Sequence, residues 1–318
     1  MLLDIAIADA YGAGFEFAKP EILAQRPNEF TRYFRHNLDN NMSGMYTDDT
    51  QMSVGLARWL LSVTPQTLQN TTARDIAWFF VDTFHRDPRQ AYSRRMFNFL
   101  KLHTNVDDFL NNIDASSTRS GAAMRSAILG VLPTLGDVVR IATLQAKVTH
   151  NTPEGIATAV AVATTAWYIR QGEHIEQAIE FGQRQAWKAA SDWICTSAPK
   201  DVEALLVTHS KIWEHTDLSI VPTSPVSYHG VPCVQAAFHA LLQHFEDPVG
   251  MLKAIVSYAG DTDTVAAISM GILSMSDGPA IIWPSWCYDN LEDGMWGRQY
   301  LVELDKQITA AWPIVLHQ

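Results

Sequence analysis

Apolar residues recur at helical spacing along most of the chain, which indicates a protein built from α-helices. The run from Val54 to Leu61 shows the pattern, because it follows a Thr- and Asp-rich stretch whose side chains would cap the first turn of a helix. The same spacing predicts further helices over residues 73–84, 121–132, 135–148, 156–169, 174–191, 233–245, 249–258 and 264–275.

Strand signals are few, and no strand–helix–strand spacing repeats. We therefore expect an all-α protein of about ten or more helices of ordinary length. Residues 216–230 contain prolines and no helical pattern, so they form either a domain boundary or, as we prefer, a surface loop. Because the chain has no low-complexity linker and no internal repeat, residues 1–318 are expected to form one compact multi-helix domain.

The composition excludes several classes of protein. Of the 318 residues, 47% are hydrophobic and 18% charged, which is typical of a folded chain with a large core. Lys and Arg number 23 against 34 Asp and Glu, and this net charge of -11 argues against a direct grip on nucleic acid. Asp4 and Asp9 interrupt the apolar N-terminal stretch, and the apolar run 155–169 is too short to span a bilayer. We expect a cytoplasmic protein without a membrane partner.

Two clusters of acidic and hydroxyl side chains each stand just before an apolar helix. The first, Thr47-Asp48-Asp49-Thr50, is by itself best explained as a helix cap, since Asp and Thr at a helix start bind free backbone N–H groups. The second is Asp261-Thr262-Asp263-Thr264, and the helix after it is almost wholly apolar, so its start should be buried. Buried carboxylates are costly unless they are paired or bind a metal. Together the clusters favour a shared site for Mg²⁺ or Mn²⁺, which take oxygen ligands.

The motifs TDDTQM at residues 47–52 and GDTDTVAA at residues 260–267 resemble those of the ADP-ribosylglycohydrolase family. That family includes the dinitrogenase reductase-activating glycohydrolases and the hydrolases of ADP-ribosyl-arginine and ADP-ribosyl-serine. The resemblance extends from Leu2 to Met275 and implies an all-α fold with a binuclear metal site at its centre, holding two Mg²⁺ or Mn²⁺ ions. It carries the metal ligands onto Thr47, Asp48, Asp49, Asp261, Asp263 and Thr264.

The N-terminal segment from Asp9 to Glu16 resembles the opening motif of the same family. The resemblance makes Glu16 a mobile acid that reaches a metal and the scissile ribose, while Asp9 falls on a helix-end residue with a structural role. The residues alone leave open that Glu16 is a solvated loop carboxylate.

Residues 117–125 place a glycine and small side chains at a helix start, where backbone N–H groups are free to bind an anion. They resemble a family loop that holds the distal ribose and phosphates, with Ser120 in the place of the usual Asn. The resemblance implies substrate contacts from Ser117, Ser120, Gly121, Ala122 and Met124. His150 matches a family His that contacts ADP-ribose, although a lone His there could equally be a cap or core residue.

The largest departure from the family pattern is at residues 89–95, where relatives often have a glycine-rich stretch beside the phosphates. This chain instead has Arg94 and Arg95, which form either a basic helix face, as we prefer, or a phosphate clamp that narrows the pocket. Tyr92 is expected to contact the substrate. With Phe15 and residues 283–296, it is a candidate for the pocket of the acceptor group.

These features predict a metal-dependent hydrolase that removes ADP-ribose from a modified acceptor, with ADP-ribosylated arginine on a protein as the favoured substrate. A metal-bound water would attack the anomeric carbon of the distal ribose. We expect Asp48, Asp49 or Asp261 to orient this water, and Glu16 to gate the site or assist the leaving group. Two alternatives stay open: hydrolysis of a serine, nucleobase or small-metabolite conjugate, and a relative that binds ADP-ribose without cleaving it.

Overall fold

The computed structural model describes residues 1–26, 29–37, 42–89, 91–197, 200–220, 224–276 and 280–314. Within these ranges the chain forms α-helices, two short 3₁₀ helices and isolated backbone bridges, but no β-strand. The prediction of an all-α fold is therefore confirmed. No helix in the described part of the chain is long and apolar enough to cross a membrane.

Three helices form the centre of the molecule: α1 (Leu2–Ala13), α9 (Pro153–Arg170) and α14 (Thr262–Leu273). Every residue of α14 is buried, as expected for a helix that is apolar on all sides. Helix α14 packs against both α1 and α9. The first of these contacts is close, because a Cβ atom on Gly12 would lie 2.6 Å from the Asp263 Cα atom.

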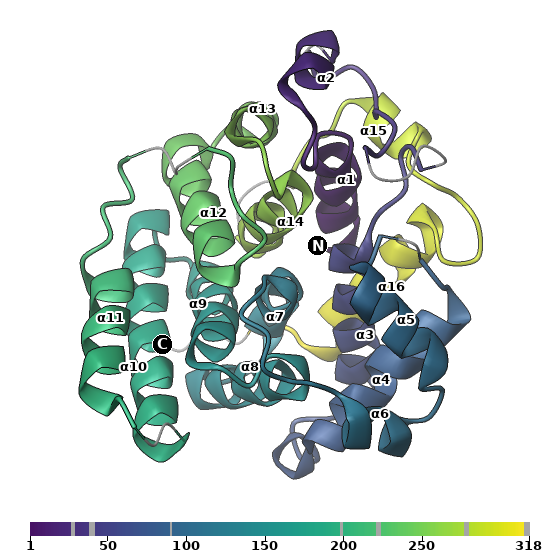
Figure 1. Cartoon of the computed structure of the whole chain (residues 1–318). Helices are drawn as coiled ribbons and strands as arrows, with labels where there is room; N and C mark the ends of the chain where they lie inside the picture. The colour runs from purple at the N-terminus through teal and green to yellow at the C-terminus, as the bar shows by residue number, and fades with distance from the viewer. Residues whose placement is uncertain are drawn as a thin grey trace.

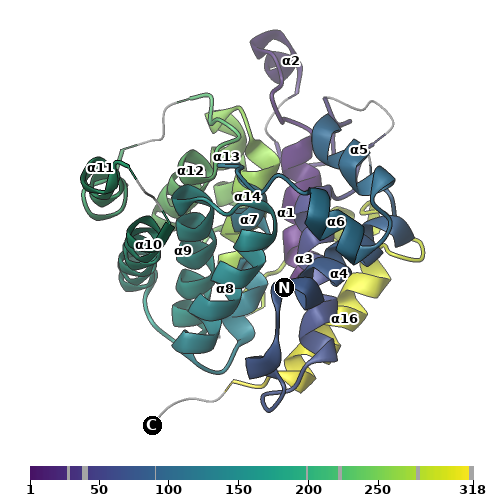
Figure 2. The ribbon, with the colours of Figure 1, turned by 60° about the horizontal axis from the view of Figure 1, so that its bottom comes forward.

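The remaining helices cover this centre from two sides (Figure 1). The group on the α9 side consists of α8 (Leu135–Thr149), α10 (Ile175–Ser197), α11 (Val202–Glu214), α12 (Gly230–His244) and α13 (Pro248–Tyr258). The group on the other side consists of α3 (Asp48–Ser62), α4 (Ala73–Arg86), α5 (Arg94–Leu102), α6 (Val106–Asn112) and α16 (Arg298–Ala311). Figure 2 shows α16, from the C-terminal end of the chain, lying along α3.

The short elements complete the architecture. They are α2 (Pro20–Gln25), α7 (Gly121–Met124), α15 (Ser285–Asp289) and the 3₁₀ helices Leu68–Asn70 and Ala127–Val131. Helix α2 stands out from the rest of the molecule (Figure 2). Buried apolar side chains from Leu2 to Trp312 form one contiguous core. All these helices except α2, which has no buried residue, therefore contribute to a single hydrophobic interior.

One predicted helix is wrong in its extent. Residues 121–132 form α7 and then a 3₁₀ helix in place of a single α-helix. The Ser126 N–H bonds to the Ala123 carbonyl, one residue closer than in an α-helix. At the break, the Arg125 side chain turns inward and donates to Gln145 and Thr149. These buried partners fix the chain direction at the point where regular helix periodicity would continue.

Candidate metal and substrate site

The two acidic clusters, far apart in the sequence, meet where three central elements come together. Helix α3 begins at Asp48, and α14 begins at Thr262. The two helices pack against each other and against α1, with their N-termini toward the C-terminal end of α1. The acids of both clusters line a cleft of about 920 Å³, which is also lined by Glu16. The residues from the two clusters that line it are Asp48, Asp49, Asp261, Asp263 and Thr264, whereas Thr47 lies behind them.

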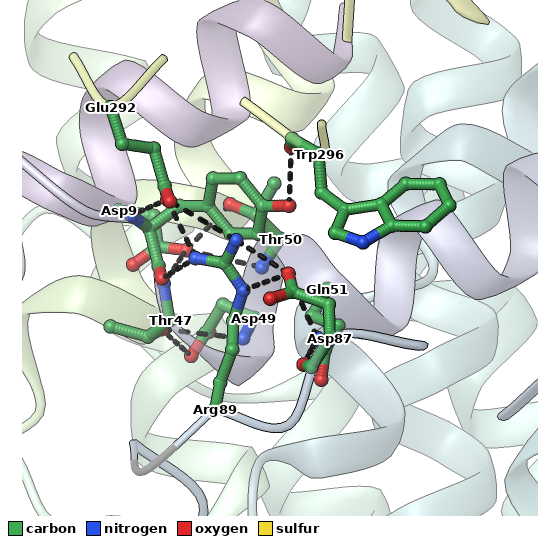
Figure 3. Close-up of polar contacts among 10 residues, drawn as sticks. Asp9, Thr47, Asp49, Thr50, Gln51, Asp87, Arg89, Glu292 and Trp296 are labelled. Atoms are coloured by element: carbon green, nitrogen blue, oxygen red, sulfur yellow. Dashed lines mark hydrogen bonds and ion pairs between the residues drawn. The ribbon is translucent and has the colours of Figure 1, made fainter. Parts of the chain in front are cut away.

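Asp9 holds the start of α3 from the inner side. Its Oδ2 atom accepts hydrogen bonds from the Thr47 N–H at 2.9 Å, the Thr50 N–H at 3.1 Å and the Thr50 hydroxyl at 2.5 Å (Figure 3). Asp9 is fully buried, and this burial raises its pKa to about 6 despite the three bonds. The contacts fix the backbone of the turn that carries Asp48 and Asp49.

The acidic side chains of the cleft are crowded and mostly buried. Asp49, Asp261 and Asp263 are each less than 5% exposed, and Asp48 is partly exposed. Burial, followed by repulsion from neighbouring carboxylates, raises the pKa of Asp261 to about 6 and that of Asp48 to about 8. The pKa values of Asp49 and Asp263 are raised well above their usual range by the same two causes.

The donor set fits a hard divalent cation. Asp49 Oδ1 is buried and has no hydrogen-bond partner among the described residues, so this oxygen is free to bind an ion. Its other oxygen, Oδ2, accepts from the Thr47 hydroxyl at 3.1 Å. Carboxylate and hydroxyl oxygens at helix N-termini are ligands that Mg²⁺ and Mn²⁺ accept. A bound cation would also remove the repulsion that raises the pKa values of these acids.

Glu16 is paired with a histidine that the sequence does not single out. His36 Nε2 lies 3.0 Å from Glu16 Oε2, and the His36 ring is buried. Oxygen or nitrogen atoms of Glu16, His36 and Asp263 all lie within 4.8 Å of one another. Glu16 is therefore held at the acidic cluster, and the alternative of a solvated loop carboxylate does not describe its surroundings. Nothing in the sequence around His36 forms a motif that could have identified it.

A second wall of the cleft is formed around α7. Ser117, Ser120, Gly121, Met124 and His150 line it, whereas Ala122 is fully buried behind them. The His150 ring packs on Gly121, where a Cβ atom would lie 2.8 Å from its Cε1 atom. Its Nδ1 atom is 2.7 Å from the Thr149 hydroxyl. Burial, with the charges of Arg125 and Arg119, lowers the pKa of His150 to about 3, so the ring is neutral at physiological pH.

The segment 224–230, part of the predicted surface loop 216–230, joins the second acidic cluster to the wall around α7, where the Tyr228 carbonyl accepts from the Ser120 N–H at 3.1 Å. The Val226 N–H donates to the Ala259 carbonyl at 3.1 Å, and the Val226 carbonyl accepts from the Asp261 N–H at 3.0 Å. Tyr228 and His229, which follow, line the cleft. A loop interpretation is compatible with this placement, but residues 221–223 lie outside the described part of the chain.

The chain resembles known proteins over nearly its whole length. The sequence profile of the ADP-ribosylglycohydrolase family matches residues 1–313. The chain belongs to the ADP-ribosylglycohydrolase family. An uncharacterized protein of Archaeoglobus fulgidus is 26% identical over 311 residues, which cover 95% of this chain and 92% of that protein. ADP-ribosylhydrolase ARH3 of Gallus gallus is 25% identical over 272 residues, covering 76% of this chain and 72% of that protein.

A solved structure from an ADP-ribosylglycohydrolase-related protein complex has the same fold. It superposes over 98% of this chain and 95% of its own with a TM-score of 0.65, at 19% sequence identity. The family consists of hydrolases that act on ADP-ribosylated substrates. Membership therefore assigns this chain to the hydrolases of ADP-ribose conjugates at the level of the family.

The segment that departs from the ADP-ribosylglycohydrolase pattern forms the third wall of the cleft. Tyr92, Arg94 and Arg95 all line it, while Gln90 lies outside the described residues. The Tyr92 hydroxyl is buried and has no hydrogen-bond partner in the described part of the chain. Arg95 forms an ion pair with Asp114 at 2.7 Å, whereas Arg94 has no ion-pair partner among the described residues.

Two candidates for the acceptor pocket of this ADP-ribosylglycohydrolase do not line the cleft. Phe15 is buried against the rings of Tyr11 and Phe34 and does not line the cleft. Residues 283–296 also lie elsewhere, with the Trp283 indole donating to Asp4 at 2.9 Å. The other rings of this region also pack away from the cleft, Trp286 on Phe30 and Trp296 on Tyr300. The exposed rings beside the cleft are instead Phe17 and Tyr228.

Proposed function

We propose that this ADP-ribosylglycohydrolase binds two divalent cations, Mg²⁺ or Mn²⁺, and uses them to hydrolyse the bond between ADP-ribose and an acceptor. The observation that carries the proposal is the burial of carboxylates from two distant helix starts in one cleft. The pKa values of Asp48, Asp49, Asp261 and Asp263 are all raised by burial and mutual repulsion. Such a cluster is costly without a cation to compensate it.

The residues that would hold the cations are Thr47, Asp48, Asp49, Asp261, Asp263 and Thr264. When bound, the cations would polarise the ribose hydroxyls and lower the pKa of an attacking water. Asp48, which is partly exposed, would orient that water toward the anomeric carbon. Glu16, held by His36, would contact the scissile ribose from the opposite side of the cluster.

The α7 wall would bind the ADP-ribose portion of the substrate. Backbone N–H groups at the start of α7 and the side chains of Ser117 and Ser120 offer donors to ribose and phosphate oxygens. His150, neutral at physiological pH, adds a ring that can donate or accept through its Nε2 atom. Arg94, exposed on the cleft and unpaired with any described residue, would balance the charge of the phosphates.

The acceptor that we favour is arginine on a protein. The Arg119 guanidinium stacks over the Tyr228 ring at 4.4 Å, so this ring at the cleft edge already has the geometry that a guanidinium needs. Phe17, which follows Glu16 directly, lies beside Tyr228 with ring centres 6.3 Å apart. An acceptor guanidinium leaving from the metal cluster would meet these two exposed rings.

The test is a panel of conjugates combined with metal analysis. We expect Mg²⁺ or Mn²⁺ to support release of ADP-ribose from arginine-linked peptides, and EDTA to abolish it. Faster release from serine-linked peptides or from a nucleobase conjugate would replace arginine as the acceptor. Binding of ADP-ribose with bound metal but no release from any conjugate would instead indicate a binding protein. Absence of both bound metal and release would contradict the proposed function.

A further inference from the structure

A buried arginine also holds the turn at the start of α3, which carries Asp48 and Asp49. Arg89 comes from the segment after α4, and its side chain is 4% exposed. Its Nη1 atom donates to the Tyr46 carbonyl at 2.7 Å, and its guanidinium carbon lies 3.4 Å from the centre of the Tyr46 ring. Tyr46 is the residue directly before Thr47. Arg89 therefore binds the backbone immediately next to the proposed metal ligands.

Glu292, from the far end of the chain, completes this contact. It accepts from Arg89 Nη1 at 2.6 Å and from Nη2 at 3.2 Å, and it also accepts from the Tyr46 N–H at 3.0 Å (Figure 3). Both backbone polar groups of Tyr46 are thus bound by one ion pair. The two residues of the pair lie 203 positions apart in the sequence, so the contact also joins the C-terminal region to the cleft.

Asp87 occupies the remaining donors of Arg89. The Nε atom donates to Asp87 Oδ2 at 2.7 Å, and Nη2 lies 2.6 Å from the same oxygen. The Gln51 amide, one turn into α3, donates to the Asp87 carbonyl at 2.5 Å. A guanidinium has five N–H donors in a planar fork, and here four hydrogen bonds and the Nη2–Asp87 ion pair engage all three nitrogens. The network therefore fixes the position of the Arg89 side chain and also compensates its charge.

We propose that Arg89 and Glu292 are a positioning pair for the metal ligands of α3, an inference that rests on the proposed metal site. A buried ion pair is by itself weak evidence for stability, since the cost of removing two charges from water offsets their attraction. Its value here is geometric: Asp9 binds the turn at Thr47 and Thr50, and the Arg89–Glu292 pair binds it at Tyr46 (Figure 3). Loss of this pair would leave the carboxylates of Asp48 and Asp49 chemically unchanged but free to shift.

Arg89→Lys is the variant that separates position from charge. Lysine keeps the positive charge between Asp87 and Glu292, but its three donors cannot reproduce the fork of five. We expect the variant to fold with an unchanged circular dichroism spectrum and to bind Mn²⁺, measured by electron paramagnetic resonance, at least about tenfold more weakly, as for other loss of outer-shell support. Because all metal ligands remain, saturating Mn²⁺ should restore hydrolysis. Glu292→Gln, which keeps an acceptor for Tyr46, is the second variant and should weaken Mn²⁺ binding in the same direction.

Arg58→Lys is the matched control. Arg58 lies on α3, pairs with Asp82 at 2.6 Å and donates to Thr83, but no contact joins it to the described residues of the acidic clusters. Its replacement should lower the melting temperature while leaving Mn²⁺ affinity unchanged. Equal Mn²⁺ affinity of Arg89→Lys, Glu292→Gln and the wild-type protein would overturn the positioning role alone. A wild-type protein that binds no Mn²⁺ would overturn the metal site, and the inference with it.

Discussion

Among single residues, hydrogen-bond partners and position relative to the cleft separate an acid that holds the backbone from one that faces the cleft. Asp9 and Asp49 are both buried carboxylates near the same turn. Each leaves its Oδ1 atom without a partner in the described part of the chain, but Asp9 Oδ2 accepts from three donors of α3, whereas Asp49 Oδ2 accepts from the Thr47 hydroxyl. Asp49 lines the cleft, and Asp9 does not. The resemblance separates their roles, but the residues alone do not, because the difference arises from which backbone each side chain faces.

Asp261→Asn tests the metal cluster at one residue. The amide keeps the shape that contacts Ser120 and Cys233, each 3.4 Å from Asp261 Oδ2, but removes a charge from a repulsive group. We expect metal affinity and hydrolysis to fall together, by more than the roughly 10- to 100-fold cost of losing an outer-shell partner. The melting temperature in EDTA should be equal or higher. Normal turnover with Mg²⁺ would show that Asp261 is not a ligand.

Tyr92→Phe tests whether the unpartnered hydroxyl of the cleft is kept for a ligand. A buried polar group without a partner costs about 1–3 kcal/mol, so its removal should stabilise the ligand-free protein by about 1 kcal/mol. If the hydroxyl binds ADP-ribose, the same change should weaken that binding several-fold in calorimetry. Higher stability with unchanged ADP-ribose affinity would assign Tyr92 to packing alone.

At the scale of elements, hydrophobic spacing predicts the helices that lie in the core but not the places where side chains interrupt them. Helices α9 and α14 are almost wholly buried, and both were predicted from their apolar runs. The break after α7 was not predicted, because it depends on the bonds of Arg125 to Gln145 and Thr149 in another helix. Helix α1 was also not predicted, since Asp4 and Asp9 interrupt its apolar pattern and find partners only in the folded chain.

The close packing of α1 on α14 gives a prediction about Gly12. Alanine there would bring its Cβ atom to 2.6 Å from the Asp263 Cα atom, and backbone cannot yield as a flexible side chain can. We expect Gly12→Ala to destabilise the protein by about 1–3 kcal/mol or more and to lower metal affinity by displacing Asp263. In Gly136→Ala, the control, the nearest atom is the Thr134 hydroxyl at 3.8 Å, so helix propensity should leave stability equal or slightly increased. Denaturant unfolding with and without Mn²⁺ measures both effects, and equal behaviour of the two variants would contradict the packing argument.

At the scale of the whole molecule, the sequence predicts that the two acidic clusters meet but not what completes their site. The clusters carry local signals, namely acids and hydroxyls before apolar helices. His36, Tyr228 and the Arg89–Glu292 pair carry none, because each acts through a residue more than a few turns away in the chain. These contributions depend on tertiary packing, which brings segments from both ends of the chain against α3. Residue spacing within any one segment does not contain that information.

The buried acids of the cleft make the stability of the protein depend on pH, and a bound cation should alter this dependence. The pKa values of Asp9 and Asp261 are raised to about 6 and that of Asp48 to about 8, all above the value of an unfolded Asp. Groups with raised pKa values contribute stability below the unfolded pKa, and this contribution is lost as pH rises through the folded pKa. In EDTA, therefore, the cleft should destabilise the protein progressively as pH rises from about 4 to 8.

A bound divalent cation should reverse this trend, because metal ligands bind in their deprotonated form. Each proton that must leave on binding strengthens the metal-dependent stabilisation by about 1.4 kcal/mol per pH unit. The informative quantity is the difference in unfolding free energy with and without Mg²⁺, measured across this range. His150, with its pKa lowered to about 3, and other groups outside the cluster contribute equally to both conditions and cancel in that difference. We expect the difference to grow with pH and to flatten in Asp261→Asn, whereas a pH-independent difference would mean that the cation binds somewhere other than these acids.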